Sequence, residues 1–380
     1  MIFVKVLLIA TVQSHICQFH KPYVRMLHRH GCEVHVAARD NLAVKNGLKL
    51  DFVERVFDVP FHRSPFSLQN MGAYRELKKI VDAGGYDVIH CNTPVGGIVG
   101  RLAARQARAA GAQVFYTAHG FHFFQGAPGI NWAVYYPIEK WMCRYTDKLI
   151  TVNEEDFELA KRKFRTEICR IHGVGADQQR YQPPSPEQRE QLRGDLGFGP
   201  EEKLILCTGE LNANKNQITA IRAMAQVVRK VPAAKLLLAG NGGTERALRD
   251  AAESLGLSGC VQFLGYRTDL ERYVKASDLI LSCSKREGLP LNIVEGMLCG
   301  KAVVASENRG HRELVEEEIT GYLVDPLDAD GFAERICRLL AAPEPAHRLG
   351  QEAIARASRY TDEAVQDELE KLYDWSTSVP

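Results

Sequence analysis

Two carboxylates, Glu287 and Glu295, bracket a segment whose sequence predicts a turn leading into a helix. Pro290 suits the first turn of a helix, because proline has no amide hydrogen to lose and its φ is already near the helical value. We therefore expect Glu287 in the loop before the helix and Glu295 one turn inside it. The amides at the helix start would bind a diphosphate. The two carboxylates would accept hydrogen bonds from hydroxyl groups on either side of it, one from a sugar and one from a ribose. This arrangement fits a sugar nucleotide, although an ordinary helix start with a solvated acid would show the same pair.

The elements that must position these residues follow the pattern of parallel sheets covered by helices, because short apolar runs alternate with amphipathic segments. Strands are expected at residues 4–10, 33–38, 87–91, 113–117, 148–152 and 169–174, and again at 204–208, 234–239, 261–264, 279–283 and 302–305. A proline-rich run at 175–186 is the strongest linker signal. The sequence predicts an α/β protein with two Rossmann-like doubly wound domains, at 1–178 and 179–354, and a C-terminal helix at 355–380 that packs back on the first domain.

The composition is that of a globular protein, with 45% apolar and 25% charged residues among 380. This length accommodates two domains, each with its own core. The net charge is +1, but residues 1–180 carry 24 Lys and Arg against 16 Asp and Glu, whereas the remainder carries 24 against 31. The basic first half could face an anionic bilayer or a phosphorylated acceptor.

The cysteine pattern and the hydropathy indicate a cytoplasmic protein. None of the ten Cys residues forms a C-x-x-C pair, and several end expected strands, so we interpret them as buried thiols in a reducing compartment. The apolar run at 2–12 is interpreted as a first strand and not as a signal peptide. No stretch reaches the length of a membrane span, and any membrane role is therefore expected to be peripheral.

Three further motifs follow expected strands of the second half. Lys215, in the run GELNANKN, is placed to meet a phosphate as a point charge, although a solvated lysine would fit the same loop. The run GNGG from Gly240 begins like a dinucleotide fingerprint, but its third glycine position is Glu245, which favours a tight strand-to-helix turn. Gly265, followed by Tyr266 and Arg267, permits a turn at which backbone groups could approach a base edge.

Taken together, these motifs and their order resemble the retaining glycosyltransferases of family 4 over nearly the whole chain. Within that family the chain is most similar to the bacterial capsule and exopolysaccharide branch, through residues 91–97 (CNTPVGG), 117–123 (TAHGFHF) and 308–313 (NRGHRE). The resemblance implies the GT-B architecture, in which two Rossmann-like domains face a cleft. The first domain would bind the acceptor and the second the nucleotide sugar.

The resemblance also implies roles for single residues. Lys215 would hold the donor diphosphate, Glu287 would contact the sugar hydroxyls, and Glu295 would bind the ribose. His119, at the end of an expected strand, would lie beside the donor sugar and the acceptor, which makes His119, Glu287 and Lys215 the expected catalytic set. The remaining nucleotide-sugar contacts would be Arg286, Leu291, Asn292, Ile293, Gly240, Asn241 and Tyr266. On the acceptor side we expect His15 and His122, each of which also fits an ordinary surface or loop position.

Two positions depart from the family pattern. Glu210 stands where many members carry an Arg that helps to neutralise the diphosphate. Either Lys215 and the helix amides suffice with a basic neighbour such as Arg286, or Glu210 has another role, such as anchoring the lysine. Residues 11–15 (TVQSH) replace a Gly-Gly turn often seen after the first strand, so the acceptor-side loop is expected to be built differently.

The reaction implied by the resemblance is transfer of a hexose or N-acetylhexosamine from a UDP-sugar to a polyprenyl-diphosphate-linked sugar, with the anomeric configuration retained. The leaving diphosphate would take the acceptor proton, and the protein would supply positioning and electrostatic stabilisation. We expect no metal and no cofactor, because no Asp-x-Asp pair is evident at a strand end. We also expect no nucleic-acid partner.

Other functions fit the same architecture. A UDP-sugar epimerase would change the sugar without releasing UDP to an acceptor, and a silent binding protein would bind the donor without turnover. A nicotinamide dehydrogenase is disfavoured by the incomplete glycine fingerprint.

Peripheral contact with an anionic membrane is a separate expectation. An aromatic set lies near basic residues, as suits a membrane interface: Phe121, Phe123, Phe124, Trp132, Tyr135 and Tyr136. The same residues would also fit the core and surface of one helix-loop segment.

Overall fold

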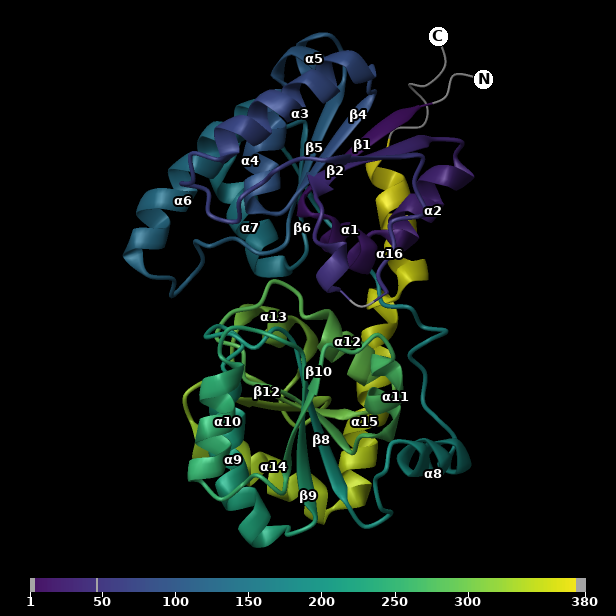
Figure 1. Cartoon of the computed structure of the whole chain (residues 1–380), viewed down its shortest axis with the longest axis vertical. Helices are drawn as coiled ribbons and strands as arrows, with labels where there is room; N and C mark the ends of the chain where they lie inside the picture. Colours follow the sequence, from purple (N-terminus) through teal and green to yellow (C-terminus); the bar gives the residue numbers. More distant parts are fainter. Residues whose placement is uncertain (1–3, 46, 374–380) are drawn as a thin grey trace. The chain divides into compact units, whose positions relative to one another are not determined.

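The computed structural model describes residues 4–45 and 47–373, and the chain divides into two compact units (Figure 1). The first unit combines the chain up to Gly175 with the segment from Asp362 onward, and the second unit is Ala176–Thr361. The sequence analysis placed these boundaries after residues 178 and 354. Both units are doubly wound α/β domains, which confirms the predicted fold class.

The first unit is built on a parallel sheet with the strand order β3-β2-β1-β4-β5-β6-β7. Its strands are β1 (Lys5–Val12), β2 (Glu33–Arg39), β3 (Arg55–Asp58), β4 (Val88–Asn92), β5 (Gln113–Ala118), β6 (Lys148–Thr151) and β7 (Glu167–Arg170). The central strands are buried along almost their whole length because helices cover both of their faces. The order of the strands reverses between β1 and β4, and such a reversal is where open α/β sheets bind ligands.

Helices cover both faces of this first sheet (Figure 1). One face carries α3 (Asn70–Gly84), α4 (Pro94–Ala103), α5 (Arg105–Ala109), α6 (Gly129–Met142) and α7 (Glu154–Lys163), and the other carries α1 (Gln13–Phe19), α2 (Lys21–Arg29) and α16 (Asp362–Leu372). Side chains of α3, α4 and α7 meet those of the sheet in one core cluster that includes Leu77, Val99 and Ala160.

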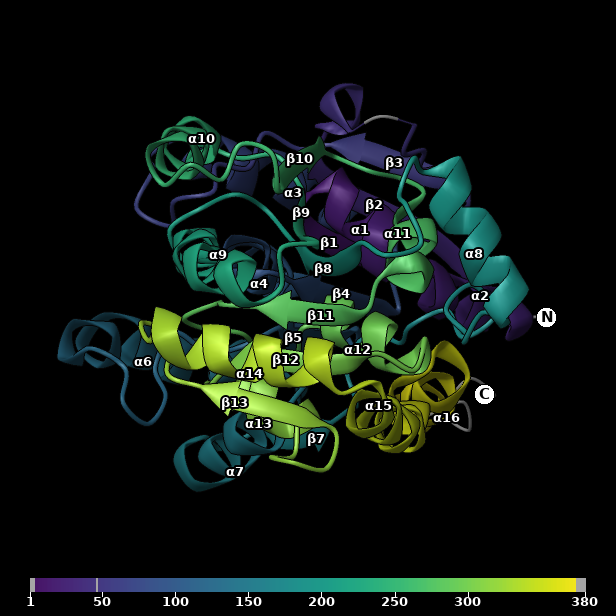
Figure 2. The same ribbon diagram turned by 90° about the horizontal axis from the view of Figure 1, so that it is seen from below.

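The second unit has a parallel sheet with the order β10-β9-β8-β11-β12-β13. Its strands are β8 (Lys203–Thr208), β9 (Ala234–Ala239), β10 (Val261–Gly265), β11 (Leu279–Ser282), β12 (Ala302–Ser306) and β13 (Gly321–Val324). Here the order reverses between β8 and β11. Figure 2 shows α9 (Gln217–Lys230), α10 (Glu245–Ser254) and α14 (Ala329–Ala341) on one face, with α11 (Leu270–Ala276), α12 (Leu291–Leu298) and α15 (Pro343–Ala357) on the other. Two more helices complete the unit: α8 (Pro186–Asp195) and α13 (Arg309–Leu314).

The C-terminal segment returns to the first unit, but it is not one helix from residue 355. Helix α15 ends at Ala357, a short 3-10 helix follows, and α16 begins only at Asp362. Helix α16 packs on α2, and the Lys148 ammonium donates to the Leu372 carbonyl at 2.6 Å. Residues 374–380 of the predicted segment lie outside the described residues.

The sequence analysis misplaced one strand and missed two. Strand β7 is Glu167–Arg170 and not 169–174, while β3 and β13 were not predicted at all. Strands β3 and β7 lie at the edges of their sheet, so most of their side chains remain partly or fully exposed and no continuous apolar run marks them.

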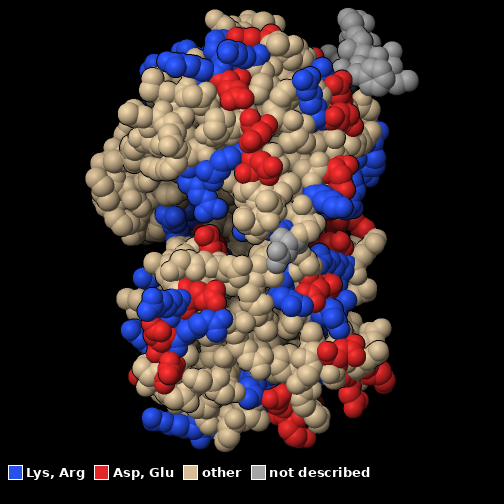
Figure 3. Space-filling view, in the orientation of Figure 1, with Lys and Arg blue, Asp and Glu red and all other residues tan. Residues whose placement is uncertain are grey.

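No helix within residues 4–45 and 47–373 has both the length and the apolar character needed to cross a membrane. Over the face drawn in Figure 3, basic and acidic side chains are interspersed in each unit. On this face the net positive charge of the first half is therefore not gathered into one continuous basic patch.

Candidate functional site

Lys215 and Glu287 meet where the strand order of the second sheet reverses. The loop after β8 carries Lys215 and the loop after β11 carries Glu287, and the Lys215 Nζ lies 2.7 Å from the Glu287 Oε1. Parallel neighbouring strands end at the same sheet edge, which is why residues so far apart in sequence meet there. Both side chains are mostly buried but keep part of their surface exposed, 23% for Lys215 and 13% for Glu287, so a ligand can reach them.

The backbone around Lys215 is fixed by two asparagines. The Asn212 Oδ1 accepts hydrogen bonds from the amides of Asn214, at 3.0 Å, and Lys215, at 2.9 Å. Asn216 adopts a left-handed conformation at the start of α9, where its buried side chain donates to the carbonyls of Cys283 and Pro326. These bonds tie the Lys215 loop to the loops after β11 and β13, so the ammonium is positioned before any ligand arrives.

Glu287 is ionised in this environment. Burial alone would raise its pKa, but the nearby charge of Lys215, together with His311 and hydrogen bonds from Lys215 and Ser284, holds the pKa below its ordinary value. An ionised carboxylate only accepts hydrogen bonds. Glu287 can therefore accept hydrogen bonds from sugar hydroxyls while it holds Lys215.

A third loop, after β12, completes this edge with His311, a residue to which the sequence analysis gave no role. Its Nδ1 lies 2.6 Å from the Ser306 carbonyl and 2.9 Å from the Asn308 Nδ2, whereas its Nε2 is buried without a hydrogen-bond partner. Burial lowers the pKa of His311 to about 4, so the ring is neutral. The run NRGH after a strand end, already noted as a family feature, was the available signal.

Gly310 brings helix α13 against the Glu287 loop. A Cβ at this position would lie 2.8 Å from the Glu287 Cβ and 2.9 Å from the Gly288 carbonyl oxygen. Only a glycine permits this close approach, and the position of the Glu287 carboxylate therefore depends on it.

Glu295 lies one turn inside α12, as predicted from Pro290, which directly precedes that helix. Burial raises the pKa of Glu295 to about 7, and a hydrogen bond with Tyr181 and the charge of Arg180 oppose this rise only in part. Tyr181 and Arg180 come from the proline-rich segment, which the sequence analysis treated as a linker. That segment therefore forms one wall around Glu295.

Two predicted nucleotide contacts have other roles in the structure. The Ile293 side chain is fully buried in the core, and its amide donates to the Pro290 carbonyl at 3.0 Å. The Gly240 amide donates to Gly265, and a Cβ on Gly240 would lie 1.9 Å from the Gly209 carbonyl oxygen. Gly240 is thus needed for the close packing of two loops, and the ligand contacts predicted for Gly240 and Ile293 stay predictions.

The remaining predicted contacts are placed at or near the same sheet edge. Asn292 donates weakly to the Thr208 carbonyl at 3.4 Å, and the Arg286 carbonyl accepts from the Asn214 side chain at 3.0 Å. Leu291 is the first residue of α12, while Asn241 and Tyr266 follow β9 and β10. The side chains of Arg286, Leu291, Asn292, Asn241 and Tyr266 all keep part of their surface exposed.

Glu210 is exposed, and Lys215 is anchored by Glu287. The hypothesis that Glu210 anchors the lysine is therefore not needed to explain the position of the ammonium.

The sequence analysis also overlooked an Asp-x-Asp pair, Asp328 and Asp330, just after β13. The Asp328 Oδ1 caps helix α14 by accepting from the Gly331 amide at 2.9 Å. The Asp330 carboxylate accepts a hydrogen bond from Gln226. Both acids thus have structural partners of their own.

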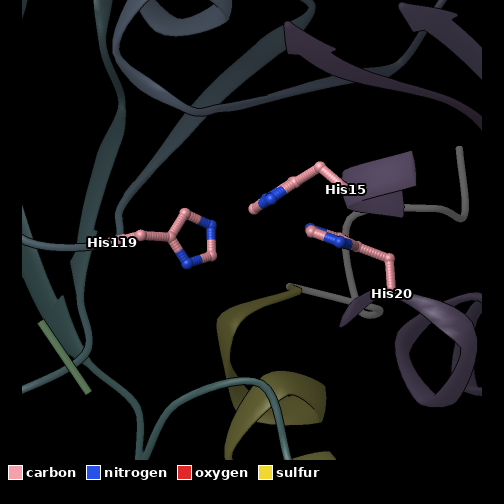
Figure 4. A group of neighbouring side chains, drawn as sticks. All are labelled: His15, His20 and His119. Carbon is pink, nitrogen blue, oxygen red and sulfur yellow. The ribbon is translucent and has the colours of Figure 1, made fainter. Parts of the chain in front are cut away.

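In the first unit the predicted residues His15 and His119 come together, and His20 joins them (Figure 4). The ring centroids of His15 and His119 are 4.9 Å apart, and those of His15 and His20 are 5.2 Å apart. We call these residues the three-histidine cluster. Burial lowers all three pKa values, to about 4 for His20, to about 3 for His119 and well below the ordinary value for His15. All three rings are therefore neutral.

His122, by contrast, packs on Tyr135 with the ring centroids 4.6 Å apart and is not a member of the three-histidine cluster. His20 was not predicted because the HICQFH run has no helical spacing, and only the turn between α1 and α2 directs it toward His15.

Most of the predicted aromatic membrane set belongs to the core. Phe121 and Phe123 are buried and stacked on each other, and Trp132, Tyr135 and Tyr136 pack against the same cluster. The helix-loop core interpretation therefore fits Phe121 and Phe123, and membrane contact through the partly exposed members of the set stays a prediction.

Both units match known families. Residues 5–153 match the family model described as glycosyl transferase 4-like, and residues 188–356 match the model described as glycosyl transferases group 1. A relative from Bacillus subtilis (strain 168), named as the glycosyltransferase EpsD, is 43% identical over 371 residues, which cover 97% of this chain and 96% of the relative. The chain belongs to the family 4 glycosyltransferases. This confirms the resemblance drawn from the motifs, and the protein is a glycosyltransferase.

Other relatives and solved structures agree with this assignment. An Escherichia coli protein, named UDP-Gal:alpha-D-GlcNAc-diphosphoundecaprenol alpha-1,3-galactosyltransferase, is 27% identical over 298 residues, with 76% of each chain covered. The crystal structure of Anabaena Alr3699/HepE in complex with UDP-glucose has a TM-score of 0.79 at 25% identity, covering 97% of this chain and 99% of that one. A sucrose-phosphate synthase from Thermosynechococcus elongatus has a TM-score of 0.81 at 21% identity, covering 99% of both chains. The architecture of this glycosyltransferase is GT-B.

Proposed function

We propose that this glycosyltransferase moves a hexose or N-acetylhexosamine from a UDP-sugar to a polyprenyl-diphosphate-linked sugar, with retention of the anomeric configuration. The process would be the synthesis of a bacterial exopolysaccharide or capsule, in the cytoplasm at the inner face of the plasma membrane. The observation that carries the proposal is the Lys215–Glu287 pair at the reversal point of the second sheet, with Glu295 one turn inside the adjoining helix.

The donor diphosphate would bind Lys215 and the start of α12. An ammonium has three N–H donors, so Lys215 can hold Glu287 and a phosphate oxygen at the same time. The amides of Leu291 and Asn292, at the positive end of the helix dipole, add to the anion site. Glu295 would accept hydrogen bonds from the ribose hydroxyls, and Arg286, Asn241 and Tyr266 would provide further contacts to the nucleotide sugar. 

In this scheme no cofactor and no divalent cation at the diphosphate are required, because Lys215 and the helix amides stabilise the charge that develops on the leaving group. The leaving diphosphate takes the proton of the attacking hydroxyl, and Glu287 orients the sugar by its hydroxyls. His119 and His15 are the proposed acceptor-side residues of the first unit, and His122 stays with them as a proposal.

The names of the relatives support the choice of donor and acceptor class. The Anabaena protein binds UDP-glucose in its crystal structure, and the Escherichia coli protein is named for a UDP-galactose donor and a diphosphoundecaprenol-linked acceptor. A UDP-sugar and a lipid diphosphate acceptor are therefore the first substrates to test.

Contact with an anionic membrane is part of the proposal, but with different residues from those expected. Phe66, Leu68 and Met71 are large apolar side chains that are more than half exposed, in a segment that also exposes Arg75. Apolar and basic side chains together suit a membrane surface. Co-sedimentation with anionic liposomes tests this, and equal binding by wild type and by the Phe66→Ser, Leu68→Ser double variant would contradict it.

The experiment that tests the proposed function follows nucleotide and sugar together. The purified protein is incubated with a UDP-sugar and a lipid-linked acceptor, and the nucleotides are separated by chromatography. We expect UDP to be released in an amount equal to that of the glycosylated product. NMR of the product is expected to show that the new linkage has the anomeric configuration of the donor. A changed UDP-sugar without released UDP would identify an epimerase, and binding without any product would identify a silent binding protein.

A further inference from the structure

The three-histidine cluster lies at the carboxyl ends of β1 and β5, on either side of β4 and next to the point where the strand order of the first sheet reverses. His15 is on α1 and His20 follows it, both after β1, while His119 follows β5, and the side chains point toward one another (Figure 4). One ring nitrogen from each residue lies within 4.8 Å of the others. Within residues 4–45 and 47–373, this is the one group of three or more His, Cys, Asp or Glu side chains spaced to share a metal ion.

Two nitrogens of the cluster have no hydrogen-bond partner. The His15 Nε2 and the His20 Nδ1 are buried and unpaired. His20 as a whole is only 4% exposed, so water has little access to it. Buried ring nitrogens in native proteins are nearly always paired, because an unpaired one loses its bond to water without compensation. Other atoms of the cluster are paired, since His20 forms hydrogen bonds with the Asn92 side chain and the His15 backbone and the His119 Nε2 lies 3.2 Å from the Asn92 Oδ1, so the two unpaired nitrogens stand out.

We propose that His15, His20 and His119 bind one divalent transition-metal ion of the zinc type. Neutral imidazoles are good ligands for zinc and its neighbours, whereas Mg²⁺ and Ca²⁺ require oxygen ligands. Zinc–nitrogen bonds are about 2.0–2.1 Å long, so side-chain rotations must draw the three rings closer around the ion. The fixed backbone positions on α1, on the α1–α2 turn and at the end of β5 already direct all three rings to one point.

Three protein ligands leave one position of a tetrahedral ion open. Sites of this kind take water or a substrate oxygen in the fourth position, whereas structural zinc sites are closed by four protein ligands. His15 and His119 keep part of their surface exposed, which gives an ion and a fourth ligand a route to the site. The three ligands all belong to the first unit, and binding of the ion does not depend on the proposed function.

Zinc binding tests the proposal directly. Wild-type protein without a polyhistidine tag is stripped with a chelator and titrated with Zn²⁺ in competition with a zinc-sensitive dye. We expect one ion per chain, no competition from Mg²⁺, and a loss of affinity of at least about 100-fold in each of His15→Gln, His20→Gln and His119→Gln, since even outer-shell changes cost 10- to 100-fold. The matched control is His28→Gln, because His28 lies on the neighbouring helix α2 and its exposed ring lies 3.2 Å from the Glu54 carboxylate, away from the cluster.

Two results would overturn the proposal: no zinc bound by wild type at micromolar concentration, or unchanged affinity in all three cluster variants. Anomalous diffraction at the zinc edge from wild-type crystals tests the site directly. This experiment does not depend on whether the histidine variants fold. A peak between the three rings supports the site, and a peak elsewhere with none between the rings contradicts it.

Discussion

The Lys215 ammonium lies 2.7 Å from the Glu287 carboxylate although the two residues are 72 positions apart in the chain. The pair joins the loops after β8 and β11, which are neighbours in the sheet at its point of reversal. Lys215 is therefore held ready for an anion by a carboxylate that can also bind sugar hydroxyls. This double role of Glu287 leads to the first prediction.

Glu287→Ala is expected to lower turnover by about 10²- to 10³-fold, the size of effect seen when one preorganised catalytic interaction is removed. The affinity for UDP is expected to change little, because UDP lacks the transferred sugar that Glu287 would contact and Lys215 stays available for the diphosphate. Steady-state kinetics and calorimetric titration with UDP measure the two quantities. Glu245→Ala, which removes an exposed carboxylate paired with Arg249 on α10, is the control. A large loss of UDP affinity in Glu287→Ala with unchanged turnover would contradict the assigned role.

UDP binding is expected to weaken as the pH falls through about 7, the pKa to which burial raises Glu295. Ribose hydroxyls donate to the ionised carboxylate, so affinity falls by about tenfold for each pH unit below the pKa, where protonation dominates. Glu295→Gln should bind UDP more weakly than wild type at pH 8, and its UDP affinity should lose the pH dependence that is caused by Glu295. The pH dependence that remains in this variant comes from titration of UDP itself. Equal UDP affinity of wild type and variant at pH 8 would refute the assignment.

The same shift has a consequence for stability without ligand. Because the folded state raises the pKa of Glu295 above its ordinary value of 4.5, the folded protein binds the extra proton between these values. Stability is therefore lost as the pH rises from about 4.5 to 7. At pH 8 the neutral Glu295→Gln variant should be more stable than wild type, by at most about 3 kcal/mol, in urea unfolding of the ligand-free protein.

The sequence predicted most of the fold because buried parallel strands appear as short apolar runs between helical segments. It failed at β3 and β13, which are four residues long, and at β7, whose side chains stay partly exposed. For the donor site, motif spacing identified Lys215, Glu287 and Glu295, but it could not show that Gly240 and Ile293 are used for packing.

His20 and His311 show what spacing alone cannot provide. His20 reaches His15 only through the turn between two short helices, and His311 reaches the neighbourhood of Glu287 only because β12 lies beside β11. Neither contact follows a periodic pattern in the sequence, and both depend on the tertiary structure.

Gly310→Ala is expected to reduce transfer far more than it reduces stability. The added Cβ would lie 2.8 Å from the Glu287 Cβ, and the loop that carries the carboxylate must move to accommodate it. The matched control is Gly243→Ala, where a Cβ would meet nothing within 4 Å. Transfer rates and thermal unfolding of both variants provide the comparison. Wild-type activity in Gly310→Ala would show that the close approach does not position Glu287.

UDP affinity is expected to be the same, within about twofold, in EDTA and in excess Mn²⁺, because Lys215 and the helix amides supply the positive charge that a metal ion would otherwise provide. Calorimetric titration in the two buffers measures this. The readout is UDP binding and not activity, so that loss of an ion from the three-histidine cluster does not affect the result. UDP binding that disappears in EDTA and returns with Mn²⁺ would contradict metal independence at the diphosphate.

The central claim is transfer of a sugar from a UDP-sugar to a lipid-linked acceptor by the site built around Lys215. The most direct measurement incubates wild type and Lys215→Ala with a panel of radiolabelled UDP-sugars and lipid extracted from bacterial membranes, and then counts the label in the lipid fraction. The account predicts label from one UDP-sugar with wild type and a loss of about 10²-fold or more with Lys215→Ala. Equal labelling by the two proteins, or no label from any UDP-sugar while the wild type binds UDP, would contradict it.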